Sequence, residues 1–161
     1  MKKVTFLLAT LLIGGMMLTG CKKETPTPTP DNPTGLVTTA VVYQVANTFE
    51  GITMSPCFKL NVTYTDANGQ SVTENNVTLP WSKTVEAKTP FHAKMEGTYV
   101  YNEADLPDQV IFGALYGIGF MKNNELNISL TGNLSSSKKE AFINSVSANP
   151  NRLKFTCEKD F

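Results

Sequence analysis

The sequence has few of the residues that build metal, acid–base or nucleic-acid sites. It contains one histidine, His92, and its 14 basic residues are matched by 14 acidic ones. Proteins that bind nucleic acid concentrate positive charge to displace counterions from phosphates, and no basic stripe is present. Alternation places His92 among solvated charges, without metal-ligand partners. We therefore expect no nucleic acid, no metal and no cofactor.

Motifs for nucleophilic or phosphate chemistry are also missing. The chain has no G-x-S-x-G sequence, no glycine-rich phosphate loop and no matched cysteine–histidine set. Glu103, Asp105 and Asp108 lack the spacing of a calcium-binding EF-hand, so we interpret their segment as a polar connection. The residues favour a protein that is not an enzyme. A hydrolase with carboxylates converging from distant strands stays open as a lesser alternative.

The first twenty residues have the pattern of a secretion signal. Two lysines precede an apolar stretch from Val4 to Leu18. The junction Leu18-Thr19-Gly20-Cys21 resembles the lipobox of bacterial lipoproteins, a family in which the cysteine thiol is acylated and cleavage follows. The resemblance implies a signal peptide over residues 1–20 and a fatty-acylated Cys21 that holds the mature chain on a membrane.

Residues 21–36 comprise the lipidated cysteine and a Thr/Pro-rich tether. Alternating Thr and Pro remove backbone donors and favour extended, polyproline-like conformations. At about 3.1 Å per residue, this spacer reaches up to roughly 40 Å. Lys22 and Lys23 follow the cysteine where the surface-export signals of some lipoproteins are acidic. We expect the periplasmic face of the outer membrane, with surface exposure as the alternative.

Residues 37–161 alternate apolar and polar side chains as half-buried strands do. Residues 58–65 form one such strand and run into Asp66-Ala67-Asn68-Gly69, which we predict as a type I′ hairpin turn. Ser137 and Glu140 have capping-box spacing and predict a short helix near the C-terminus, with Phe142, Ile143 and Val146 on its apolar face. About seven or eight strands and this helix give a mostly β domain, and two packed antiparallel sheets bury them most simply.

The segment from Val110 to Met121 is apolar on both strand parities. It either lies in the middle of the sandwich or presents one apolar face to a partner, and it is too short to cross a bilayer as a helix. Its glycines at 113, 117 and 119 indicate a bulge or a close backbone approach. On the second alternative, the partner or ligand surface consists of Leu115, Tyr116, Ile118 and Phe120.

Three segments within residues 43–89 have a distinctive sequence: Val62-Thr63-Tyr64-Thr65-Asp66-Ala67-Asn68-Gly69-Gln70, Leu79-Pro80-Trp81-Ser82-Lys83-Thr84-Val85 and the opening strand Tyr43-Gln44-Val45. Through these segments, the chain resembles the MmpS group of small mycobacterial membrane proteins. The resemblance implies an immunoglobulin-like antiparallel β-sandwich displayed outside the membrane. Members of that group accompany RND-type lipid exporters, so it also implies an accessory role beside such a transporter. The chain departs from the group in having a lipobox where the group has a membrane helix.

Two cysteines, Cys57 and Cys157, remain once Cys21 is lipidated. An even pair in an oxidising compartment favours a disulfide, and two separately buried thiols are the alternative. Trp81 has the parity of Leu79 and Val77, which favours a core anchor over a sugar-stacking platform on the surface. From these observations we predict a lipid-anchored envelope protein that binds another envelope protein or a small apolar or glycan ligand.

Overall fold

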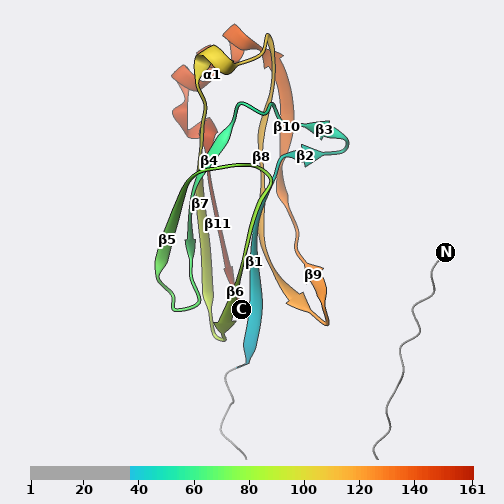
Figure 1. Cartoon of the computed structure of the whole chain (residues 1–161), viewed down its shortest axis with the longest axis vertical. Coiled ribbons are helices and arrows are strands. Elements are labelled where there is room, and N and C mark those ends of the chain that lie inside the picture. Colours follow the sequence, from blue (N-terminus) through green and yellow to red (C-terminus); the bar gives the residue numbers. More distant parts are fainter. Residues whose placement is uncertain (1–36) are drawn as a thin grey trace, which may run out of the picture. The chain divides into compact units, whose positions relative to one another are not determined.

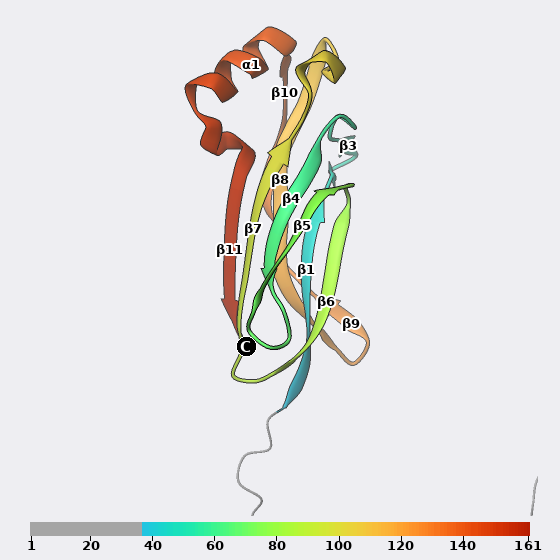
Figure 2. The same cartoon turned by 60° about the vertical axis from the view of Figure 1, so that its left-hand side comes forward.

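The computed structural model describes residues 37–161; the predicted leader, Cys21 and the whole tether lie outside the described residues. The described part is a β-sandwich of antiparallel strands with one α-helix near its C-terminus, as predicted (Figures 1 and 2). No helix within residues 37–161 is both long and apolar enough to cross a membrane.

Each face of the sandwich is one antiparallel sheet. The larger sheet has the order β10-β8-β1-β6, with β9 also paired to β8. Its strands are β1 (Thr38–Ala46), β6 (Trp81–Lys88), β8 (Gln109–Lys122), β9 (Glu125–Asn127) and β10 (Thr131–Lys138). The smaller sheet has the order β11-β7-β4-β5. Its strands are β4 (Lys59–Thr65), β5 (Ser71–Val77), β7 (His92–Val100) and β11 (Lys154–Asp160).

Three further helical elements and one small hairpin complete the described chain. The hairpin consists of β2 (Thr48–Phe49) and β3 (Ile52–Thr53), and the α-helix is α1 (Lys139–Ala148). Single-turn 3₁₀ helices, η1 (Glu103–Asp105) and η2 (Pro150–Leu153), connect β7 to β8 and α1 to β11.

The connections are immunoglobulin-like at the centre of the sandwich. β1 pairs with β6 in one sheet and β4 pairs with β7 in the other, which is the B–E and C–F pairing of an immunoglobulin domain. The place beside β1 that strand A holds in that fold is taken here by β8. Because β8 comes late in the chain and carries β10 on its other side, the larger sheet extends beyond the usual outline.

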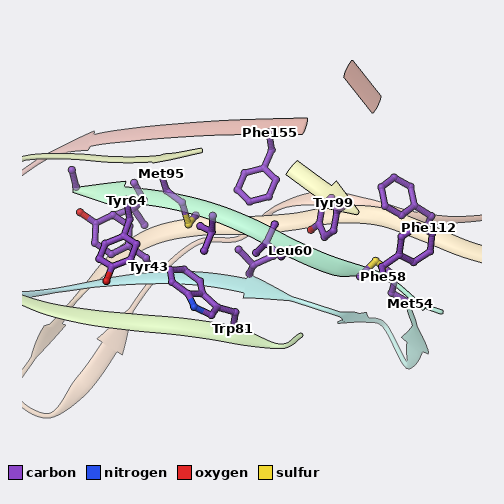
Figure 3. Close-up of a cluster of buried hydrophobic side chains, with 14 of the residues drawn as sticks. Tyr43, Met54, Phe58, Leu60, Tyr64, Trp81, Met95, Tyr99, Phe112 and Phe155 are labelled. Carbon is purple, nitrogen blue, oxygen red and sulfur yellow. The ribbon is translucent and has the colours of Figure 1, made fainter. Parts of the chain in front are cut away.

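Apolar side chains of one parity fill the space between the sheets (Figure 3). The largest fully buried ones are Tyr43, Tyr99, Leu60, Met95, Val41, Val45, Val62 and Val110. Along β4 the exposure alternates strictly, with Leu60, Val62 and Tyr64 buried and their neighbours half-buried. Burial of each such side chain contributes about 1.5–3 kcal/mol, so strand parity determines which face turns inward.

The β4–β5 hairpin forms as predicted, although its turn is not type I′. Only Gly69 has a positive φ, +77°, whereas a type I′ turn requires positive φ at both central residues. The Asp66 carboxylate instead accepts hydrogen bonds from the backbone N–H of Asn68 and Gln70, at 2.9 and 2.8 Å. Asp at the first position favours this Asx-supported turn.

A second, longer hairpin joins β8 to β9 and β10. The register is continuous from Lys122↔Glu125 to Gln109↔Lys138. Asn123 and Asn124 both have positive φ, 53° and 64°, and form the two-residue turn that suits a tight hairpin. The glycines of β8 lie where a Cβ atom would overlap the neighbouring backbone, so the predicted close approach is confirmed.

The predicted helix exists, but its predicted cap does not. Ser137 pairs with Val110 as part of β10, and the capping position is Lys138, which makes no side-chain capping bond. The strand continues further than the capping-box pattern indicated, because its register with β8 extends to Lys138. Phe142 and Val146 are buried as expected.

Candidate functional site

The apolar run lies in the middle of the larger sheet, between β1 and β10. Its even-numbered residues face the smaller sheet, and Val110, Phe112 and Ile118 belong to the main core. The ring of Tyr116 stacks on Phe155 of β11 at 4.3 Å between centroids. The first of the two alternatives for this segment is therefore the observed one.

The surface predicted from the run is corrected by the structure. Leu115 is 1% exposed and Ile118 is 3% exposed. Tyr116 and Phe120 are half-buried, and Phe120 packs edge-on against Phe161 at 5.9 Å between centroids. None of the four side chains forms an exposed apolar docking face, because Tyr116, Ile118 and Phe120 turn toward the smaller sheet and Leu115, on the opposite face, is covered.

The exposed apolar side chains lie next to these residues, on the outer face of the larger sheet. Odd-numbered residues of β8 point outward, and so do their pairing partners. Met121, Leu126 and Leu130 are 36, 45 and 39% exposed, and Ile128 is half-buried. Ile128 and Leu130 lie over Gly119 and Gly117, where no side chain rises from β8. We call Met121, Leu126, Ile128 and Leu130 the outer apolar face.

The β2–β3 hairpin crosses the same sheet further along. β1 leaves the sheet after Ala46, and β2 contacts β10 although β8 lies between β1 and β10. In Figure 1 the hairpin extends sideways past β10. Its tip carries Phe49 and Ile52, which pair with each other and are 42 and 50% exposed. Ser55 then closes the gap in the sheet by exchanging backbone and hydroxyl hydrogen bonds with Ile111, each 2.9 Å.

A groove with polar and basic side chains lies on the inner side of β10. β11, the edge strand of the smaller sheet, lies across the sandwich from β8. β10 pairs with the other side of β8, so it extends beyond the edge of the smaller sheet. The groove encloses about 270 Å³ between Tyr116, Asn133 and Ser135 on one side and Arg152 and Lys154 on the other. Its polar lining and its two cations are chemically unlike the outer apolar face.

The open side of the sandwich between β8 and β11 is closed by aromatic rings. The Tyr116–Phe155 stack and the Phe120–Phe161 contact bridge the two strands. The ammonium of Lys159 lies 5.7 Å from the Phe120 ring centre and 5.2 Å from that of Phe161. Gly97, beneath the Phe155 ring, leaves the space that this ring occupies.

The opposite side, between β5 and β6, is closed by a carboxylate. Glu74 accepts hydrogen bonds from the indole N–H of Trp81 at 3.0 Å, from the Tyr64 hydroxyl at 3.1 Å and from the Lys83 ammonium at 3.1 Å. Donation from Trp81, supported by Lys83 and Tyr64, lowers the pKa of Glu74 below its usual value. We call these four residues the Glu74 clasp, and it joins the two sheets.

Two buried tyrosines illustrate the difference between these sides. Tyr43, beside Tyr64, donates to the backbone carbonyl of Thr65 at 2.7 Å. Tyr99, beside Phe155, approaches the backbone of Leu115, but its hydroxyl makes no hydrogen bond of normal geometry. Burial raises the pKa of Tyr99 well above its usual value. Figure 3 shows the two tyrosines in separate parts of the core.

The predicted disulfide does not form, because the strands hold the two cysteines apart. Both are free, half-buried thiols. Cys157 pairs with Met95 of β7, whereas Cys57 precedes Lys59, which pairs with Val100. Five strand positions correspond to about 16 Å, far beyond the ~7 Å limit between bridged Cα atoms. Burial raises the pKa of both thiols, which disfavours the reactive thiolate.

Trp81 and His92 have the environments that strand parity predicted. Trp81 is 8% exposed and belongs to the core. His92 is a solvated side chain, 2.7 Å from the carboxylate of Asp160. The acidic segment forms η1, capped by Asn102. Within residues 37–161, no group of three or more His, Cys, Asp and Glu side chains is arranged to hold a metal ion.

The sequence contained one signal for the exposed faces that the prediction missed. Leu126, Ile128 and Leu130 have the same parity, and Asn123-Asn124 is a hairpin turn signal. Pairing the two segments across that turn would have placed the three side chains outside. Comparison with known proteins gives no further guide, since no family model and no curated protein matches the chain.

Proposed function

We propose that this chain is a lipid-anchored protein of the bacterial cell envelope that binds another envelope protein through its outer apolar face, without catalysing a reaction. The lipobox-like junction at Cys21 supports the anchor. The observation that carries the binding role is the exposure of Met121, Leu126 and Leu130 together on one sheet face. Apolar side chains gathered on a surface mark interaction sites.

The shape of this face favours a protein partner over a small molecule. Gly117 and Gly119 place no side chains on the outer face of β8, so Ile128 and Leu130 lie close to its backbone and form a shallow surface. Small ligands are bound in concave sites that bury most of their area, whereas protein interfaces are broad. A transporter subunit, as the MmpS-like segment implies, is one partner of this kind.

The anchor is tested by mass spectrometry of the membrane fraction. We expect a chain that begins at an acylated Cys21, and a Cys21→Ala variant that is released from the membrane or retains its leader. An unmodified Cys21 in a chain that still carries residues 1–20 would contradict the anchor.

The binding face is tested by site-specific photo-crosslinking in the envelope. A photoreactive amino acid at Met121 should give a discrete adduct with a second protein. The same amino acid at Glu86, exposed on the outer face of β6 in the same sheet, should give none. Equal labelling from the two positions, or none from Met121, would contradict the proposed face.

The groove under β10 supports a second candidate function, binding of an acidic glycan. Arg152 and Lys154 supply positive charge, Asn133 and Ser135 supply hydrogen-bonding groups, and the Tyr116 ring lies at the wall. Isothermal titration with an acidic oligosaccharide should show binding that Arg152→Ala weakens. With the photoreactive amino acid in place of Met121, the Arg152→Ala variant should still crosslink to the partner protein. This result would separate glycan binding from protein binding.

A further inference from the structure

The four edge strands of the sandwich differ in how they resist pairing with another chain. Natural sheets protect their edges with charged side chains, prolines and bulges. β5 has a register irregularity opposite β4 and carries Glu74. The charged residues of β6 and β11 are Lys83, Glu86, Lys88, Lys154, Glu158, Lys159 and Asp160. Three of the four edges are therefore protected.

The fourth edge, β9–β10, carries charges only at its two ends, Glu125 and Lys138. From Leu126 to Ser137 the chain has no charged residue and no proline. The carbonyl oxygens of Asn127, Ser129 and Asn133 face the glycines of β8. Since alternate residues of an antiparallel strand point to opposite neighbours, the even-numbered residues direct their N–H and C=O groups outward. This edge presents a row of unpaired backbone groups along β9 and β10, interrupted at residues 128–130, which lie in neither strand.

The side chains of this edge also alternate in character. Residues 126, 128, 130 and 134, on the outer face, are Leu, Ile, Leu and Leu, and the inner-face residues from 127 to 137 are Asn, Ser or Thr. A strand added to this edge matches it only if it is apolar on the outer face and polar on the inner face. Another β9–β10 strand has that pattern.

The β2–β3 hairpin lies over the space where such a strand would be added. Its tip extends past β10 (Figure 1), and Phe49 and Ile52 are 42 and 50% exposed there. These two side chains have no sheet beneath them in the single chain. A strand added beside β10 would give them an apolar surface, formed by residues such as the added chain's Leu130.

We propose that the β9–β10 edge pairs antiparallel with the same edge of a second copy of this chain, across a two-fold axis normal to the sheet. This rotation keeps each outer face outward, so even-numbered residues of one copy oppose even-numbered residues of the other. The two larger sheets become one continuous sheet, and the interface is isologous.

The oligomeric state tests the proposal directly. Sedimentation equilibrium of the full chain in density-matched detergent should give a dimer. Leu130→Lys places a charge on the edge of each copy, immediately before β10, and should weaken dimerisation by about tenfold or more. Met121→Lys is the matched control, because Met121 has nearly the same exposure, 36 against 39%, but lies on β8, one strand inside the edge. It should remain dimeric.

A second variant keeps the test informative if Leu130→Lys is unstable. Ser136 is already exposed and polar and lies on the same edge, so Ser136→Lys should fold normally and still weaken the dimer. A wild-type chain that stays monomeric at every concentration overturns the proposal. Equal weakening by Leu130→Lys and Met121→Lys overturns it too, since the contact would then be the sheet face.

The outcome is separable from that of the proposed function. Ser136→Lys, which lies on the edge but outside the outer apolar face, should keep the adduct between Met121 and a different protein. A photo-adduct from Met121 that contains only a second copy of the chain would contradict the proposed function. The sedimentation experiment would then decide whether the two copies pair through the β9–β10 edge.

Discussion

The two open sides of the sandwich are closed by opposite chemistry. Between β5 and β6, one carboxylate gathers the donors of Trp81, Tyr64 and Lys83. Between β8 and β11, aromatic rings stack and leave the hydroxyl of Tyr99 unpaired. The first side depends on ionisation and hydrogen bonding and the second on buried area. The two sides should therefore respond differently to truncation, pH and salt.

Truncation of the aromatic side should have the largest effect. Phe155→Ala removes a ring that is 6% exposed and contacts Tyr116 and Tyr99. A loss of about 3–5 kcal/mol in the free energy of unfolding is expected, measured by urea denaturation. Phe49→Ala at the exposed hairpin tip is the control and should cost roughly 0.5 kcal/mol or less. Similar losses from both variants would mean that the stack does not close this side.

The Glu74 clasp should be weaker and dependent on pH. Glu74→Gln removes the charge that three donors share, and should cost about 1–2 kcal/mol near neutral pH. The folded protein lowers the pKa of Glu74, so the ionised form carries the stabilisation. That contribution is present above the unfolded pKa of about 4.3 and disappears as pH falls through the lower folded value.

Urea denaturation of wild type and Glu74→Gln from pH 7 to pH 3 measures this effect. The difference between the two proteins should shrink at the acid end, and high salt should reduce it. Glu86→Gln, on the exposed face of β6, should stay within about 0.5 kcal/mol of wild type. A Glu74→Gln deficit that is unchanged at pH 3 would show that the carboxylate acts through its shape alone.

The two tyrosines should respond with opposite sign to the same change. Tyr43→Phe loses the bond to Thr65 and should cost about 1 kcal/mol. Tyr99→Phe removes a buried hydroxyl that has no partner, and should leave the protein unchanged or stabilise it by up to about 1 kcal/mol. Paired thermal or urea unfolding decides this, and a destabilised Tyr99→Phe would reveal a partner for that hydroxyl.

The smallest effect is expected from the cation on the aromatic side. Lys159→Met keeps the side-chain length and removes the charge above Phe120 and Phe161. We expect a loss of roughly 0.5 kcal/mol, as for other exposed cation–π pairs. Lys94→Met, whose ammonium meets Glu96 and Glu158 at the surface, is the control for removal of charge alone.

Local patterns predicted the parts of the fold that depend on one strand at a time. Alternation placed Leu60, Val62 and Trp81 in the core and His92 outside. The β4–β5 hairpin followed from its turn residues, and the helix from its buried face. These features depend on periodicity and local turn chemistry, which are present in the sequence.

Features that depend on register between distant segments could not be predicted in this way. The separation of Cys57 from Cys157 follows from where β4 and β11 each pair with β7. The burial of Leu115 depends on its place between β1 and β10 and on the hairpin beside that part of the sheet. Both parities of β8 are apolar, and periodicity alone could not tell a central strand with both faces covered from a docking face.

The central position of β1 affects how the domain can assemble. The first strand of the described chain pairs with β6 and β8, for example Val41 with Val85 and with Phe120. Its partners are therefore synthesised long after it, and sheets built from such distant contacts fold slowly, in milliseconds to seconds. Until residue 120 is available, the N-terminal part of the domain has no complete sheet to join. A chain with this order of contacts completes its sheets only when nearly all of it has been synthesised.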